Sequence, residues 1–165
     1  MAKQTRKVTL KAQEGQVFDI DQDIAKEFGI LNRIMEEDGL FEFFPVSNVR
    51  GAALEKVIEY CQKHVEFRTR AAQKDGDQTD NVKAFDDGFV NGLRNEELKE
   101  LIVAADYLEV KKLLDLLIQT IANRIKNKSV EYVRKLFEIE NDYTAEELND
   151  LHQKNAWAFE GVDDD

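Results

Sequence analysis

Two stretches near the start of the chain alternate between apolar and polar residues. Such alternation is typical of strands with one buried face, and a glycine-containing break between two runs is typical of a hairpin turn. Glu14-Gly15 forms the break here. The alternating apolar positions are Val8, Leu10 and Ala12 before it, and Phe18 and Ile20 after it. The pattern therefore predicts a β-hairpin.

Helical spacing follows in two segments, with a short strand over 41–46 between them. The first helix is predicted to begin after Asp21 or Asp23 as N-cap and to end at Asp38-Gly39, and Asn48 is the predicted N-cap of the second. The apolar stripe of the first helix is Ile24, Phe28, Leu31 and Met35. That of the second is Val49, Ala53, Val57, Tyr60 and Cys61.

Residues 66–82 lose this periodicity. The segment is polar and is too long for an ordinary connection within a compact domain. It is predicted to be a flexible acidic loop. Apolar residues return with Phe85, Phe89 and Leu93, and two amphipathic helices follow, the first capped by Asn95. Their stripes are Leu98, Leu101, Ile102, Ala105 and Leu108, then Val110, Leu113, Leu114, Leu117, Ile121 and Ile125.

A helix from Ser129 to about Ile139 carries apolar residues on two nearly opposite sides. One side holds Val130, Val133 and Phe137, and the other holds Tyr132, Leu136 and Ile139. Such a helix needs two apolar neighbours, so one side is expected to face a partner. Burial of both sides within the chain is the alternative.

The final helix has a specific start signal. Thr144 is the predicted N-cap, Glu147 completes a capping box, and Tyr143 with Leu148 forms a hydrophobic staple. Trp157 falls off the stripe of this helix, which is Leu148, Leu151, His152 and Asn155. The alternation of Trp157 and Phe159 with alanines favours an irregular or extended tail in a hydrophobic contact, either with the chain itself or with a partner.

Charge and composition narrow the possible partners. The 165 residues are 42% hydrophobic, and their net charge of −11 repels nucleic-acid phosphates and anionic membrane surfaces. We therefore expect no nucleic-acid or membrane partner. A single cysteine excludes an intrachain disulfide, and the start of the sequence lacks the apolar core of a signal peptide, so an intracellular protein is expected.

Candidate chemistry is sparse. Cys61 and His64 share a helix, but the cysteine occupies a core position, so a buried thiol is favoured over a catalytic pair. Glycine-rich phosphate loops are absent from the sequence. A calcium loop over Asp75, Asp77, Thr79 and Asp86 lacks its glycine and its bidentate Glu, so an acidic solvated loop is the better interpretation. We expect no enzyme activity, no metal site and no cofactor.

The carboxy-terminal half resembles a known family. The segment ELIVAADYLEVKKLLDLLIQTIANRIKNKSVEYVRKLFEIENDYTAEEL is similar to the S-phase kinase-associated protein family, adaptors that join F-box proteins to a cullin in SCF-type ubiquitin ligases. The specific runs are Ala-Ala-x-Tyr-Leu at 104–108, Leu-Leu-Asp at 113–115, Ile-Ala-Asn at 121–123 and Arg-Lys-x-Phe at 134–137. VFDIDQDIAKEF and FPVSNVRGAALEKVIEYC extend the resemblance to nearly the whole chain.

The resemblance implies an α/β (α+β) fold, with a BTB/POZ domain over residues 1–128 and two F-box-binding helices with an acidic tail over 129–165. It assigns F-box binding to Val133, Leu136, Phe137, Ile139, Asn141, Trp157 and Phe159. It assigns cullin binding to Val46, Asn48, Val49, Asp106 and Tyr107. Members usually carry Asn at the position of Asp106, so the added charge is expected to weaken cullin docking.

These expectations define an adaptor with two partners, F-box proteins and a cullin amino-terminal domain, working in the cytoplasm and nucleus. The alternative is a structural scaffold that self-associates as a homodimer through its BTB domain.

Overall fold

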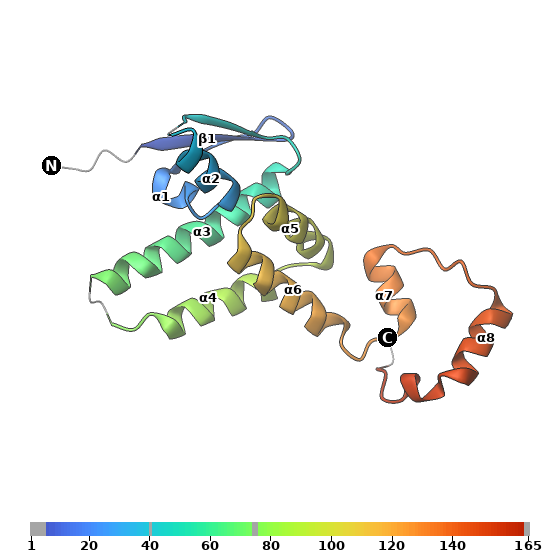
Figure 1. Ribbon diagram of the computed structural model, residues 1–165. Coiled ribbons are helices and arrows are strands. Elements are labelled where there is room, and N and C mark those ends of the chain that lie inside the picture. The colour runs from blue at the N-terminus through green and yellow to red at the C-terminus, as the bar shows by residue number, and fades with distance from the viewer. Residues whose placement is uncertain (1–5, 40, 74–75, 164–165) are drawn as a thin grey trace. The chain divides into compact units, whose positions relative to one another are not determined.

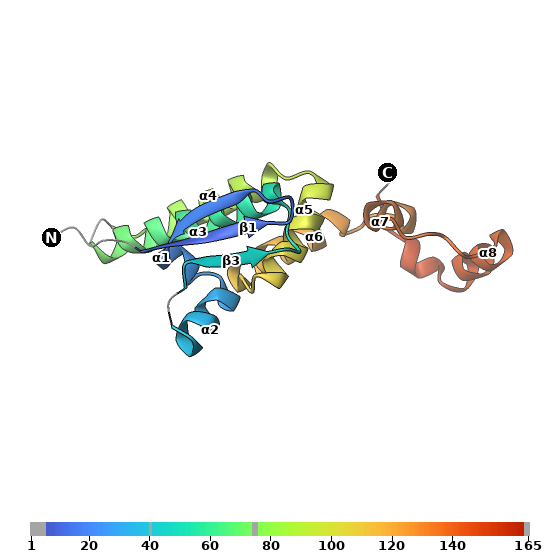
Figure 2. The same ribbon diagram turned by 90° about the horizontal axis from the view of Figure 1, so that it is seen from above.

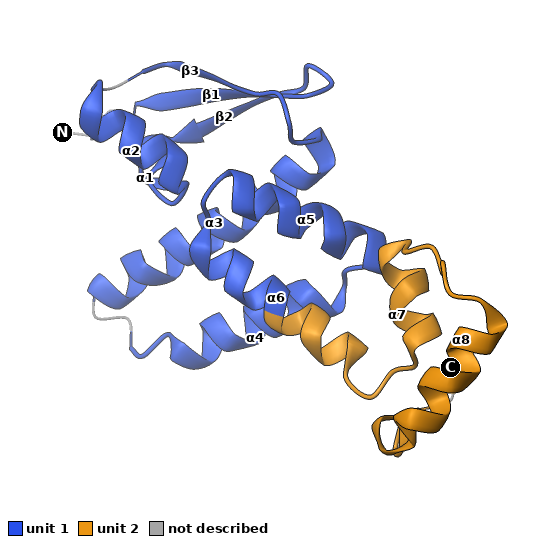
Figure 3. Ribbon diagram, turned by 45° about the vertical axis from the view of Figure 1, so that its right-hand side comes forward, with its two compact units in different colours: residues 1–118 blue, residues 119–165 orange. Residues whose placement is uncertain are grey.

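The computed structural model describes residues 6–39, 41–73 and 76–163, which divide into two compact units. The first covers residues 1–118 and the second residues 119–165 (Figure 3). The division falls within helix α6 (Lys111–Ile125), ten residues before the boundary expected from the sequence. The small sheet and the helices together make a mixed α/β fold, which confirms the predicted fold class.

A small sheet forms one side of the first unit (Figures 1 and 2). β1 (Lys7–Ala12) pairs with β2 (Val17–Asp21) in antiparallel register and with β3 (Phe43–Val46) in parallel register, giving the order β2-β1-β3. The hairpin and the third strand are thus confirmed. Gly15 supplies the turn with a φ of +92°, which glycine adopts without strain.

The single helix predicted over 24–38 is wrong, because the chain breaks it into α1 (Gln22–Ala25) and α2 (Gly29–Glu37). Gly29 begins α2 directly against Glu109, where an added Cβ would lie 2.8 Å from the Glu109 Cβ. Its backbone N–H donates to the Glu109 carbonyl at 3.3 Å. The break buries Phe28 completely, so a core contact outweighs helical continuity.

The predicted loop over 66–82 is also wrong. α3 (Gly51–Ala72) continues far into it, and α4 (Thr79–Asn91) begins inside it. Aromatic rings explain the continuation, because Phe67 of α3 packs edge to face on Phe85 of α4 with centroids 6.0 Å apart. Tyr60 lies 5.5 Å from Phe89 in the same cluster. These contacts lie between residues far apart in the sequence, so no local pattern in residues 66–82 shows that both helices extend into that segment.

Helix starts in the first unit differ from the predicted caps. Arg50 rather than Asn48 is the N-cap of α3, and the Gly51 N–H donates to Oε2 of Glu14 in the hairpin turn, at 2.9 Å. Arg94 rather than Asn95 precedes α5 (Asn95–Tyr107), and its own N–H donates to the Glu97 carboxylate at 2.9 Å. At α3, the carboxylate of the distant Glu14 thus accepts the hydrogen bond that the local cap Asn48 was expected to accept.

The core of the first unit follows the predicted stripes closely. Val57, Cys61, Leu98, Leu101 and Leu108 are all at most 1% exposed. The cap of α7 (Val130–Phe137) is confirmed, since the Ser129 hydroxyl accepts the Tyr132 N–H at 3.0 Å. α6 (Lys111–Ile125) begins where the second stripe was predicted.

The second unit contains α7, α8 (Ala145–Lys154) and a 3-10 turn, η1 (Ala156–Phe159). The capping box of α8 is confirmed, with the Thr144 N–H donating to Glu147 at 2.8 Å and the Glu147 N–H donating back at 3.2 Å. The tail around Trp157, predicted to be irregular or extended, is instead the short 3-10 turn η1, which follows directly after α8. Asp163 closes the unit by donating its N–H to the Asn127 carbonyl at 2.7 Å.

Candidate functional site

Large apolar side chains remain exposed on the second unit. Among its described residues, the only buried hydrophobic side chains are Ile121 and Leu136. The exposed ones are Val130, Phe137, Ile139, Tyr143, Leu151 and Trp157. A unit that leaves several large apolar side chains exposed to solvent is typical of a protein-binding surface.

α7 and the residues after it carry five of the predicted F-box-binding positions. Val133 is half-buried, Leu136 is buried, and Phe137 is exposed at the last turn of the helix. Glu138 ends the helix in the left-handed conformation with a φ of 57°. The Ile139 N–H then donates to the Arg134 carbonyl at 2.8 Å, which is typical of a helix C-cap and leaves Ile139 and Asn141 exposed beyond it.

η1 carries the other two predicted positions, Trp157 and Phe159, which differ sharply. Phe159 stacks on His152 of α8 with ring centroids 4.0 Å apart and an interplanar angle of 19°. Trp157 is 74% exposed. The tight 3-10 turn thus directs one aromatic ring onto its own helix and the other into solvent.

The predicted cullin-binding residues of the first unit also differ in their exposure to solvent. Asn48 and Asp106 are exposed and Tyr107 is half-buried. Val46 and Val49 are at most 2% exposed, so their side chains belong to the core of the first unit. They pack into the core because β3 ends at Val46 and the Val49 N–H donates to its carbonyl at 3.3 Å. They can position the exposed turn of Ser47 and Asn48 between them.

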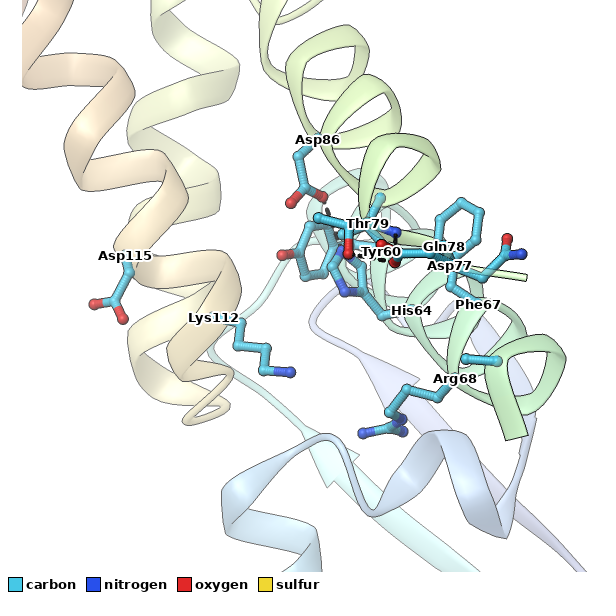
Figure 4. Close-up of a pocket in the computed structure, with 12 residues that line it drawn as sticks. Tyr60, His64, Phe67, Arg68, Asp77, Gln78, Thr79, Asp86, Lys112 and Asp115 are labelled. Carbon is cyan, nitrogen blue, oxygen red and sulfur yellow. Dashed lines mark hydrogen bonds and ion pairs between the residues drawn. The ribbon is translucent and has the colours of Figure 1, made fainter. Parts of the chain in front are cut away.

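A cavity of about 540 Å³ lies beside α3, α4 and α6, with Tyr60 and His64 among the residues that line it (Figure 4). Several of its polar and charged groups are already bonded within the chain. His64 Nε2 lies 2.8 Å from the Asp86 carboxylate, Arg68 pairs with Glu27, and the Thr79 hydroxyl donates to Asp77 at 2.6 Å. Desolvation, followed by the Asp86 charge, raises the pKa of Tyr60 above its ordinary range. We interpret this cluster as structural.

Cys61 is a core residue, as the sequence indicated. It is 1% exposed, and burial, followed by the nearby Glu27 charge, raises the pKa of its thiol to about 12. A thiol with that pKa stays protonated near neutral pH and is a poor nucleophile. The His64 side chain pairs with Asp86, and not with the Cys61 thiol.

The acidic segment that was compared with a calcium loop is only partly a loop. Asp75 lies outside the described residues, while Thr79 and Asp86 belong to α4. Over the parts of the chain that the structure describes, His, Cys, Asp and Glu side chains form no group of three suited to a metal ion. Over the same ranges, no helix is long and apolar enough to cross a membrane.

Sequence reasoning did not find three of these contacts: the His64–Asp86 pair, the His152–Phe159 stack, and the carboxylate of Glu14 at the start of α3. The stack joins α8 to η1 across the helix end at Asn155, so helical spacing does not predict it. The His64–Asp86 pair joins residues 22 apart across two helices and leaves no local signal.

Comparison with known proteins identifies the family. Residues 6–66 match the Skp1 family, tetramerisation domain, and residues 111–158 match the Skp1 family, dimerisation domain. SKP1-like protein 20 of Oryza sativa subsp. japonica is 42% identical over 166 residues, covering 93% of this chain and 94% of the relative.

Two relatives from Arabidopsis thaliana are similarly close. SKP1-like protein 1A is 39% identical over 158 residues and SKP1-like protein 14 is 36% identical over 156 residues. Each alignment covers 94% of this chain and at least 98% of the relative. Since identity of this level extends over nearly the full length of both chains, the protein belongs to the Skp1 family, a family of adaptors of SCF ubiquitin ligases.

Proposed function

We propose that this protein links a cullin to F-box proteins as the adaptor subunit of an SCF-type ubiquitin ligase, in the cytoplasm and nucleus. Other subunits carry out ubiquitin transfer, so the adaptor needs neither a catalytic residue nor a cofactor. The observation that carries the proposal is the exposure of Trp157 at 74%, beside other exposed apolar residues of the second unit. An apolar F-box helix would remove these side chains from water.

The F-box site of the proposal consists of Val133 and Phe137 on α7, Ile139 and Asn141 after it, and Trp157 on η1. Leu136 supports α7 from its buried side, and Phe159 holds η1 through its stack on His152. This division separates residues that contact the partner from residues that position them. It implies that substitutions in the first group weaken binding without unfolding the protein.

The cullin site of the proposal consists of Asn48, Asp106 and Tyr107. Val46 and Val49 contribute by holding the turn that presents Asn48, because their own side chains are buried. Two binding sites on one chain bring the F-box protein, and the substrate it carries, to the ligase at high effective concentration. The net charge of −11 would favour partners with basic surfaces.

A binding experiment with both partners tests the proposal. The purified protein is titrated with an F-box segment and, separately, with a cullin amino-terminal domain, and each mixture is then analysed by size-exclusion chromatography with light scattering. We expect a complex with each partner and a ternary complex with one copy of each. Absence of F-box binding by the folded wild-type protein would refute the adaptor function.

A second candidate function, self-association as a scaffold, is supported by the outer face of the sheet. Val17 pairs with Lys11, and Phe43 pairs with Thr9, so both apolar residues lie on the face opposite the buried Val8 and Leu10. They are 55% and 53% exposed. A stable homodimer that excludes the cullin domain, and that Phe43→Ser dissociates, would favour the scaffold over the adaptor.

A further inference from the structure

After η1 the chain returns to the start of α7 (Figure 1). Gly161 turns it with a φ of +73°, and the Asp163 N–H then donates to the Asn127 carbonyl at 2.7 Å. The Asp163 carboxylate also lies 3.6 Å from Nζ of Lys128. We call residues 160–163 the tail strap. Because the two residues that it contacts directly precede the N-cap of α7, the tail strap closes α7, α8 and η1 into a ring.

Lys128 is held in place by a second contact. Its Nζ lies 5.4 Å from the centre of the Tyr132 ring, in the first turn of α7, which is within the range of a cation–π contact. Its side chain is only 29% exposed. An ammonium group that is already held loses less side-chain freedom on pairing with a carboxylate than a mobile surface lysine does. The tail strap is therefore attached at a defined point beside α7.

Little apolar core holds the helices of the second unit together. Leu136 is the only buried hydrophobic side chain among the described residues of α7, α8 and η1. The stack of Phe159 on His152 joins η1 to α8, and not to α7. The Arg134 guanidinium, 5.8 Å from the centre of the Tyr143 ring, links α7 to the segment before α8. At the other end of the ring, the tail strap links η1 to the start of α7.

The proposed F-box site takes residues from both sides of this ring. Phe137 and Ile139 come from α7 and the residues after it, whereas Trp157 comes from η1, and all three are exposed. One partner helix can contact both groups only at a suitable distance between α7 and η1. If that distance were set only on binding, the cost of ordering the unit would reduce the affinity. A contact that fixes η1 relative to α7 in the free protein therefore strengthens binding.

We propose that Asp163 and Lys128 are positioning residues, which hold η1 at the distance from α7 that the F-box site requires. This inference rests on the proposed adaptor function. Neither residue needs to contact the partner, because the tail strap acts by placing Trp157 before binding. Loss of one hydrogen bond and one partly exposed ion pair should weaken F-box binding about three- to tenfold.

The test uses variants that remove the contacts of the tail strap together or singly. Asp163→Pro removes both the N–H that donates to Asn127 and the carboxylate that pairs with Lys128. Asp163→Ala removes the carboxylate alone, and Lys128→Met removes the ammonium group alone. Glu160→Gln is the matched control, because it removes an exposed charge from the same strap.

Energy transfer within the free protein tests the positioning without a partner. Trp157, the only tryptophan, is the donor, and the acceptor is a thiol-reactive dye on Lys135→Cys, at an exposed position of α7. The buried Cys61 does not compete for the dye. Time-resolved measurements should show a broader range of donor–acceptor distances in Asp163→Pro than in wild type or Glu160→Gln. Equal distributions in the three proteins would overturn the inference.

Titration with a fluorescently labelled F-box segment tests the consequence for binding. Asp163→Pro should bind about three- to tenfold more weakly than wild type, Lys128→Met should show part of this loss, and Glu160→Gln should show little. Binding of a cullin amino-terminal domain should stay unchanged. In a Trp157→Ala background, Asp163→Pro should cost little further, because the tail strap acts through Trp157. Fully additive losses would show that the strap does not act through Trp157 and would overturn the inference.

The outcomes also separate this inference from the adaptor function. If Trp157→Ala weakens binding of the F-box segment while Asp163→Pro and Lys128→Met do not, the positioning role is refuted and the adaptor stands. If folded wild-type protein does not bind the segment, the adaptor function and the role of the tail strap in it are both refuted. Lys128→Met tests the same link if circular dichroism shows that Asp163→Pro fails to fold.

Discussion

The imidazole of His152 stacks on the phenyl ring of Phe159, with centroids 4.0 Å apart and planes inclined by 19°. This contact fixes the end of η1 against α8 and leaves Trp157, two positions earlier, exposed. The two aromatic residues therefore have different tasks: Phe159 holds the turn, and Trp157 is available to a partner.

Trp157→Ala should weaken F-box binding by about 2 kcal/mol or more, because a buried aromatic anchor typically contributes that amount to an interface. The free protein should unfold at the wild-type temperature, since the ring is 74% exposed and its loss leaves no cavity. Calorimetric titration with an F-box segment measures the first effect, and circular dichroism measures the second. Cullin binding serves as the control and should stay unchanged. Global unfolding of the variant would mean that Trp157 belongs to an internal core.

His152→Ala should loosen η1 by removing the stack, at a cost of about 1 kcal/mol of local stability. The faster amide exchange expected at residues 156–159 can be followed by hydrogen–deuterium exchange. His152→Phe keeps a ring in place and is the matched control. If both variants exchanged like wild type, the stack would not be what orders the turn.

Cys61 should react very slowly with thiol reagents in the native protein and rapidly in urea. Its thiol is buried, and its pKa is raised to about 12 from an ordinary 9.0. A folded-state pKa above the unfolded value contributes stability that is present below the unfolded pKa and is lost as pH rises through the folded pKa. We therefore expect part of the alkaline loss of stability between about pH 9 and 12 to depend on Cys61. Urea unfolding of wild type and Cys61→Ala across this range measures that part.

Glu14→Gln should lower the unfolding temperature at neutral pH. Hydrogen bonds from its own backbone N–H and from the Gly51 N–H, in that order, lower the pKa of the Glu14 carboxyl below its ordinary 4.5. A lowered pKa contributes stability above the unfolded value, and that contribution is lost as pH falls through the folded value. The difference between wild type and variant should thus shrink below about pH 4.5. A difference that stayed constant down to acid pH would show that charge at Glu14 does not support the start of α3.

Asp106→Asn should tighten cullin binding by about 1 kcal/mol, because it removes an exposed carboxylate from the proposed cullin surface and restores the residue usual in the resembling adaptors. Asp87→Asn makes the same charge change on the exposed side of α4 and controls for net charge. Titration with the cullin amino-terminal domain at two salt concentrations compares them. Equal effects of the two variants would place Asp106 outside the cullin surface.

Local sequence signals predicted those features whose causes are themselves local. The Ser129 and Thr144 caps act within one helical turn, and the alternation of Val8 and Leu10 reports directly on which side of a strand is buried. The apolar stripes predicted for α5 and α6 likewise contain most of the buried residues of these two helices. The predicted helix stops and starts failed at Asn48 and near Gly29, where distant Glu14 and Glu109 decide the conformation.

The sequence by itself determined the strands, the amphipathic helices, two of the helix caps and the family, because periodicity, capping chemistry and motif spacing are properties of neighbouring residues. Only the tertiary structure decided that α3 and α4 both extend into the supposed loop, that Val46 and Val49 are buried while Asn48 is exposed, and that Trp157 rather than Phe159 faces solvent. These outcomes depend on contacts between segments far apart in the chain or on the geometry of a single turn. Their free energies outweigh local preference and have no pattern within one segment.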